Sequence, residues 1–138
     1  MIATESELRE VERTIEYMIA WALTKDLEGL LANVAQDEAF FIFHPDSKST
    51  ILGFDAFRRM AEGMWMNDAF RATDHAIREL RIGFAELGNV AWYSCYLDDH
   101  GEWKGKRTGW ENCRWTGTLE KRNGKWVVVQ MHFSFARD

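Results

Sequence analysis

The polar residues of this chain that could do chemistry lie in or beside apolar, strand-like segments, and His44 is the first of them. It follows the apolar, aromatic run 39–43 and precedes Pro45. Because an imidazole titrates near neutral pH, a histidine beside a ligand can accept or donate a proton. A histidine at the end of a strand is more often half-exposed and without a chemical role. Both interpretations of His44 stay open at this point.

Arg114 lies between large apolar residues in another strand-like run, 107–121. A buried guanidinium needs partners, since an unpaired buried charge is costly. One interpretation is a structural ion pair or a position at a rim. The other is that its forked donors anchor a ligand carboxylate or enolate. In that case Arg114 would stabilise developing negative charge while His44 transfers the proton, which makes the two the candidate catalytic residues.

The remaining ionisable side chains form no recognisable site. His75 and His100 are expected at a strand start and a loop tip, and no close carboxylate pair accompanies the scattered histidines. The spacing therefore predicts no metal site. Asp98 and Asp99 are expected in a solvated hairpin loop. No Ser or Cys nucleophile signature is found, and we expect neither a metal nor a cofactor.

The composition is that of an acidic, aromatic-rich chain of 138 residues, which predicts a single domain over residues 1–138. The net charge is −5 and no basic stripe occurs, so neither nucleic acid nor an anionic membrane is expected as a partner. No run approaches the roughly 18 apolar residues of a membrane span. The acidic start, 1–10, lacks the apolar region of a signal peptide. With only Cys95 and Cys113, both expected as buried small residues, we expect a cytoplasmic setting.

Three helices followed by long strands are expected to position these side chains. Apolar residues at helical spacing predict helices over 4–22, 26–34 and 54–66, with Thr4 and Glu7 as a capping box. Strands are predicted over 39–43, 72–84, 90–97, 107–121 and 125–135. Residues 98–105 predict a hairpin loop, and Asn123–Gly124 predicts a two-residue turn. This order predicts an α+β fold with helices on one face of a sheet.

The register of the last two strands predicts a homodimer. A two-residue turn pairs Arg122 with Lys125, and continuing that register places residues of constant summed number opposite each other. The pairs that follow include Arg114–Phe133, Trp115–His132 and Thr116–Met131. Both faces then carry large apolar groups, and helices can cover only one of them. The simplest cover for the other face is a second copy of the chain.

The order of short motifs in the second half of the chain resembles the nuclear-transport-factor-2-like superfamily, and within it the SnoaL-like group. The motifs are Arg114-Trp115-Thr116, then Asn123-Gly124-Lys125-Trp126, then His132-Phe133-Ser134, with Ala91-Trp92-Tyr93 before them. The resemblance covers nearly the whole chain. It implies a cone-like, strongly curved antiparallel or mixed sheet wrapped around three N-terminal helices, open at one end and usually dimeric through the sheet.

The resemblance also implies that ligand-contacting residues line the cone. Carried over, the wall candidates are Trp92, Arg114, Thr116 and Phe133 on the strands, Tyr17 or Trp21 on the first helix, and Trp65 on the third. His132 shares a predicted face with Trp115 and Trp126. That placement favours a hydrogen-bonded structural histidine in the core or dimer seam over a base, and His132 is kept as a candidate ligand contact.

The superfamily includes polyketide cyclases, steroid isomerases, dehydratases, epoxide hydrolases and non-enzymatic assembly domains, so the fold leaves the function open. Steroid isomerases use a carboxylate base near a proline after the first strand, where this chain has His44. Tyr17 lies one position from the expected tyrosine slot, near Met18, and no matching buried acid is found. Steroid isomerisation is therefore not expected.

Two functions remain. One is an enzyme that does acid–base chemistry, such as isomerisation, cyclisation or dehydration, on an apolar ligand in the cone. The other is a non-catalytic module that binds an apolar or carboxylate-bearing small molecule or serves as an oligomerisation hub.

Overall fold

The computed structural model describes residues 3–138, and it confirms the predicted α+β fold with helices on one face of a curved, mixed sheet. The helical elements are α1 (Glu5–Thr24), α2 (Leu27–Ala32), η1 (Ser47–Ser49), α3 (Phe54–Met60) and η2 (Ala61–Trp65). The strands are β1 (Phe41–Phe43), β2 (Ile51–Leu52), β3 (Phe70–Phe84), β4 (Val90–Trp103), β5 (Lys106–Arg122) and β6 (Lys125–Ser134). No helix of the described part is long and apolar enough to cross a membrane.

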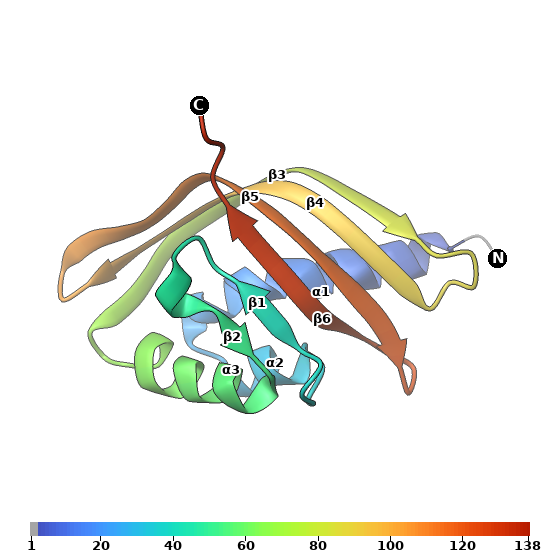
Figure 1. The fold of residues 1–138 in the computed structure, drawn as a ribbon, viewed down its shortest axis with the longest axis horizontal. Coiled ribbons are helices and arrows are strands. Elements are labelled where there is room, and N and C mark those ends of the chain that lie inside the picture. The colour runs from blue at the N-terminus through green and yellow to red at the C-terminus, as the bar shows by residue number, and fades with distance from the viewer. Residues whose placement is uncertain (1–2) are drawn as a thin grey trace.

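The strand order is β2-β1-β6-β5-β4-β3, with β1 parallel to β6 and the other neighbours antiparallel. Figure 1 shows the long strands arching over α1, α2 and α3, which lie together beneath the sheet. The concave face therefore carries the core, and β1 and β2 form its short edge beside α3.

The first helix begins as the sequence predicts and is then tied to the far end of the sheet. The Thr4 hydroxyl accepts a 3.1 Å hydrogen bond from the Glu7 backbone N–H, as an N-cap does. The Glu7 carboxylate accepts from Lys121 Nζ at 2.5 Å and from Trp126 Nε1 at 2.6 Å. Glu7 thus joins the start of α1 to β5 and β6, rather than reaching back to the cap.

The β4–β5 hairpin is longer than the sequence pattern predicts, and the expected loop at 98–105 is wrong. Both strands continue to a turn at Lys104–Gly105, where both residues have positive φ, as a tight two-residue hairpin requires. The polar residues that suggested a loop pair across the strands instead. Arg78 of β3 bonds Asp98 of β4, for example.

The β5–β6 register is the predicted one only near the turn. Leu119 pairs with Val128 and Arg122 with Lys125, but a bulge between Thr118 and Leu119 leaves Val129 as an extra residue on β6. Beyond it the pairs are Arg114–Ser134, Trp115–Phe133 and Thr116–His132, so the predicted pairs there are wrong. A one-residue shift moves every later β6 side chain to the opposite face. Trp115 and Phe133 consequently share the buried concave face.

Candidate functional site

A cavity of about 460 Å³ lies between the concave face of the sheet and the helices. That volume is in the range of small-molecule sites, which are mostly apolar with a few placed polar groups. Its walls come from α1, the α3–η2 segment, the end of β1, the β4–β5 hairpin and β6. Its aromatic lining comprises Trp21, Phe57, Trp65, Phe70, Trp103, Trp110 and Phe133.

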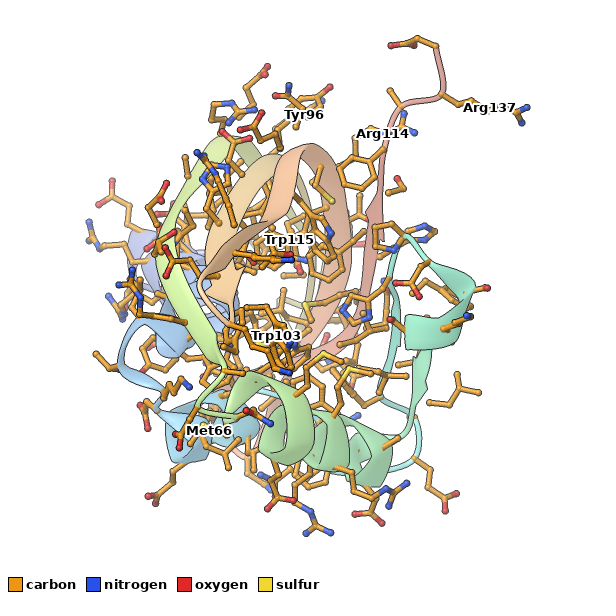
Figure 2. The ribbon with its side chains drawn as sticks, turned by 90° about the vertical axis from the view of Figure 1, so that its left-hand side faces the viewer. Met66, Tyr96, Trp103, Arg114, Trp115 and Arg137 are labelled. Atoms are coloured by element: carbon orange, nitrogen blue, oxygen red, sulfur yellow. The ribbon has the colours of Figure 1, made fainter. Side chains whose placement is uncertain are left out.

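Two pairs of tryptophans, one from the helices and one from the β4–β5 hairpin, form part of the wall. Trp21 of α1 packs against Trp65 at 6.2 Å between ring centroids, and a π-helical turn, η2, carries Trp65 to that position. Trp103 and Trp110 come from the β4–β5 hairpin. Figure 2 shows Trp103 between the hairpin and the helix below it. The long hairpin therefore completes the cavity on the side that the helices leave open.

His44 directly follows β1, and its ring is stacked on Phe133 at a 5.4 Å centroid distance and a 6° interplanar angle. Its Nδ1 lies 2.6 Å from the Ser49 carbonyl oxygen. Because a carbonyl only accepts, Nδ1 carries the hydrogen, and Nε2 of the neutral ring keeps a free lone pair. Burial lowers the pKa of His44, and the Ser49 bond and the Asp46 charge oppose this shift without cancelling it. His44 is thus a neutral proton acceptor at neutral pH.

Asp46 and Asp99 are the carboxyl groups that line the cavity, and Asp99 lies half-buried on β4 between Trp110 of β5 and His75 of β3 in the strand register. Burial raises the pKa of Asp99 to about 6, with the His100 charge opposing this and the Asp74 charge adding to it. Trp110 also contacts the His44 ring at 5.9 Å. Residues paired across two strands have Cβ atoms about 5 Å apart. Because Trp110 is paired with Asp99 and also contacts the His44 ring, Asp99 and His44 lie in the same part of the cavity.

His100 follows Asp99 on β4, is also among the residues that line the cavity, and is held by two acids. Its Nδ1 is 2.9 Å from Asp74 Oδ2, and its Nε2 is 3.3 Å from Glu111 Oε1. The hydrogen bond that the His100 ring donates to Asp74 raises the pKa of His100 above its ordinary value, against a smaller effect of burial. The two acids hold His100 in place, and it is not one of the two groups of the acid–base pair.

The arrangement suits proton transfer to and from a ligand that carries no negative charge inside the cavity. Asp99 has a raised pKa and His44 a lowered one, so near pH 6 the cavity can offer one proton acceptor and one proton donor. None of the described residues that line the cavity is a lysine or arginine. Within residues 3–138, no group of three or more metal-ligating side chains is assembled.

A profile of the SnoaL-like domain family matches residues 11–138, which is nearly the whole chain. The chain belongs to the SnoaL-like family. A search of curated proteins finds no match. Among solved structures, this SnoaL-like chain is similar to a putative scytalone dehydratase from Novosphingobium aromaticivorans, with a TM-score of 0.80 and 19% identity over 96% of this chain and 85% of that one.

Two other solved structures share the fold of this SnoaL-like chain. A putative aromatic ring hydroxylase from Novosphingobium aromaticivorans has a TM-score of 0.80 and 13% identity, covering 99% of this chain and 94% of that one. A nuclear-transport-factor-2-like protein of unknown function from Pseudomonas putida has a TM-score of 0.74 and 18% identity, covering 100% and 92%. At these identities the likeness shows the fold, the open α+β cone expected for a SnoaL-like protein.

The structure brings four of the predicted site residues into the SnoaL-like cavity. These are His44, Trp21, Trp65 and Phe133. Tyr17 lies on another side of α1, where its hydroxyl bonds Asp26, and it does not line the cavity. The remaining four, Trp92, Arg114, Thr116 and His132, are exposed on the convex face of the sheet.

The β6 bulge explains why Arg114 lies outside. It pairs with Ser134 rather than Phe133, and its Nη2 donates a 3.2 Å hydrogen bond to the Phe135 carbonyl. Figure 2 shows Arg114 and Tyr96 at the outer edge while Trp115 lies inside. The predicted placement of Arg114 beside His44 in one cavity is therefore wrong.

Sequence reasoning missed Asp99, which it placed in a solvated loop. The signal for Asp99 was its place in the alternation of buried and exposed residues along β4. Tyr93, Cys95 and Leu97 are buried, and Asp99 is the next residue of that two-residue period. A strand carries alternate residues to one face, so an acid at that position faces the interior once the strand is known to continue. The polar neighbours of Asp99 concealed that continuation.

Proposed function

We propose that this SnoaL-like protein is an acid–base enzyme that moves a proton next to a carbonyl group of a ring-containing small molecule. The observation that carries the proposal is the presence of Asp99 and His44 in one apolar cavity, with pKa values shifted toward each other by burial. Groups that titrate near the working pH are the most effective general acids and bases. The aromatic walls suit a flat ring.

In the proposed step, Nε2 of neutral His44 removes a proton from the carbon next to the ligand carbonyl. Protonated Asp99 donates its proton to the carbonyl oxygen, and the product is an enol. If the proton returns to a different carbon, the net reaction is an isomerisation. If a β-hydroxyl leaves as water instead, taking a proton from His44, the net reaction is a dehydration. In both outcomes the ionised Asp99 takes the enol hydroxyl proton back as the carbonyl re-forms, so the acid and the base end in their starting states.

The test follows exchange of the α-protons of 2-tetralone in D₂O by proton NMR, since this bicyclic ketone reports enolisation without knowledge of the natural substrate. We expect the protein to accelerate exchange. His44→Gln and Asp99→Asn should each lower that acceleration by about 10²-fold or more, the range of general acid–base effects.

Matched controls lie on the convex face. His132→Gln and Asp98→Asn change the same residue types outside the cavity, and they should leave the exchange rate within about twofold. If 2-tetralone binds but the protein does not accelerate exchange, the acid–base proposal is wrong and a non-catalytic ligand-binding module takes its place.

We also propose that the convex face forms a homodimer. Trp92 is 50% exposed, Phe43 44% and Tyr96 40%, all on the face that the helices do not cover. Large apolar side chains gathered on one sheet face mark a contact surface, and a two-fold axis would place this face against itself. Light scattering should give twice the chain mass at micromolar concentration for the parent protein and the monomer mass for Trp92→Glu. A monomeric parent protein overturns the dimer.

The two cysteines are free and buried, which supports the proposal of a reducing, cytoplasmic setting.

A further inference from the structure

The mouth of the cavity carries a group of lysines that the acid–base proposal does not use. Lys25 follows α1, its Nζ donates to the Asn67 carbonyl at 2.8 Å, and it lies 6.0 Å from the centroid of the Phe70 ring, which lines the cavity. The Lys104 backbone N–H donates to the Ala69 carbonyl at 2.8 Å. The segment that joins η2 to β3 thus brings these two lysines to one end of the cavity.

Lys106 completes the group. It pairs with Trp103 across the β4–β5 hairpin, and directly opposed residues point to the same side of a sheet. Because Trp103 lines the cavity, Lys106 lies beside the mouth as well. We call Lys25, Lys104 and Lys106 the rim lysines. Lys104 and Lys106 are exposed and Lys25 is half-buried.

The rim lysines are free to bind an anion. None of them forms an ion pair with a carboxylate of residues 3–138. The acids nearby in the chain are Asp68, in the segment that joins η2 to β3, and Glu102, which is paired with Arg71. In a chain of net charge −5 they form a local excess of positive charge. The interior has the opposite character, since its lining includes Asp46 and Asp99 but no lysine or arginine of the described part.

This charge arrangement orients a ligand. An anionic group inside the cavity would lie near the carboxyl groups of Asp46 and Asp99, no lysine or arginine lines the interior, and the His100 ring is already held by Asp74 and Glu111, so placing the anion there is costly. The same group at the mouth would meet three ammonium groups. Asp99 and Trp103 are four residues apart on β4, so the rim lies about 13 Å from the acid–base pair along the strand.

We propose that the ligand is an amphiphile whose apolar ring enters the cavity and whose single anionic group, a carboxylate or a phosphate, is bound by the rim lysines. This proposal rests on the proposed function for the identity of the reacting end and adds the ligand class. It places the anion about one short chain length from the ring, at the mouth of the cavity and away from the convex face that carries Arg114.

The test compares 4-(2-naphthyl)butanoate with the uncharged 4-(2-naphthyl)butan-1-ol by isothermal titration calorimetry. The four-carbon chain allows the ring to reach Asp99 and His44 while the carboxylate stays at the rim. We expect the acid to bind about 5- to 10-fold more tightly than the alcohol at low ionic strength, from three modest surface attractions. That advantage should shrink in 0.5 M salt, which shortens the screening length to about 4 Å. The shorter 2-naphthylacetate should bind no more tightly than its corresponding alcohol, because its carboxylate cannot reach the rim lysines while the ring lies beside Asp99 and His44.

The triple variant Lys25→Gln, Lys104→Gln, Lys106→Gln should remove the advantage of the acid and leave the alcohol affinity unchanged. Lys125→Gln is the matched control, because Lys125 is an exposed lysine beside the turn of the other long hairpin, β5–β6. Circular dichroism verifies that each variant is folded.

The proposal is overturned if acid and alcohol bind equally to the parent protein, if neither binds at millimolar concentration, or if the advantage of the acid survives in the triple variant. Loss of the advantage in Arg114→Gln instead would assign the anion to the convex face. These readouts are independent of 2-tetralone exchange. Absence of exchange with retained charge selectivity rejects the acid–base chemistry alone, and the reverse result rejects the rim site alone.

Discussion

Replacing Asp99 by asparagine should stabilise the folded protein at neutral pH, because the native site holds a carboxyl group that burial keeps from ionising easily. The unfolded chain ionises Asp99 with its ordinary pKa of 3.8, whereas in the folded protein the pKa rises to about 6. As the pH rises through that window, the unfolded state loses its proton first and gains stability relative to the native state. The parent protein therefore pays a stability penalty above pH 6 that Asp99→Asn lacks.

The size of the effect follows from the two pKa values. A shift from 3.8 to about 6 corresponds to about 3 kcal/mol when both forms are compared well above pH 6. At pH 4 the penalty is only about 0.5 kcal/mol, because the native group is protonated and the unfolded one is about half ionised. The stability gained by Asp99→Asn should therefore be about 2–3 kcal/mol larger at pH 7 than at pH 4.

Urea unfolding of both proteins at the two pH values measures this difference. Any cost of placing an amide in the site is the same at both pH values and cancels. Asp98→Asn is the control with the opposite sign: hydrogen bonds from the Asn112 backbone and from Arg78 lower the pKa of Asp98 despite some burial. That variant should lose more stability at pH 7 than at pH 4. If Asp99→Asn gives the same change at both pH values, the carboxyl is solvated and the reasoning about the cavity fails.

Three further predictions concern the site and its supports. The 2-tetralone exchange rate should fall as the pH rises through about 6, because Asp99 loses the proton it must donate; a rate that keeps rising to pH 8 contradicts this assignment. Glu7→Gln should cost about 1–2 kcal/mol in urea unfolding at pH 7 and less at pH 4, since hydrogen bonds from Lys121 and Trp126 lower the pKa of Glu7; equal losses at both pH values would show that the carboxylate charge contributes nothing. Trp65→Ala should weaken 4-(2-naphthyl)butan-1-ol binding about 10-fold by calorimetry, the value of one aromatic contact, and unchanged affinity would place the ring elsewhere.

The elements of the fold were predictable because their signals are local. Helical spacing, the Thr4 cap and the Asn123–Gly124 turn each act over a few residues, and the structure contains all three. The four pairs nearest the turn, residues 119–122 with 125–128, also follow from the turn alone. The SnoaL-like ending adds the order of the strands, which local patterns do not specify.

The composition of the site was only partly predictable, because two non-local features decide it. Val127, Val128 and Val129 are consecutive β-branched residues, so no alternation reveals which one the bulge skips. Asp99 lies in a polar stretch typical of a loop, and only pairing across three strands shows that the stretch is a sheet. His44 was predicted because it ends a strand whose apolar character is visible in the sequence alone.

The bulge at Val129 also makes the sheet tolerant to change in an unusual way. Before the bulge the even-numbered residues of β6 face inward, and after it the odd-numbered residues do. Deleting that one residue would make Val128 and Gln130 adjacent and would leave Phe133 opposite Trp115, so both halves of β6 would keep the same side chains on the same faces. A substitution at Arg114, Thr116 or His132 alters only the convex surface. Homologous chains could therefore diversify their assembly surface by point mutation while the cavity stays the same.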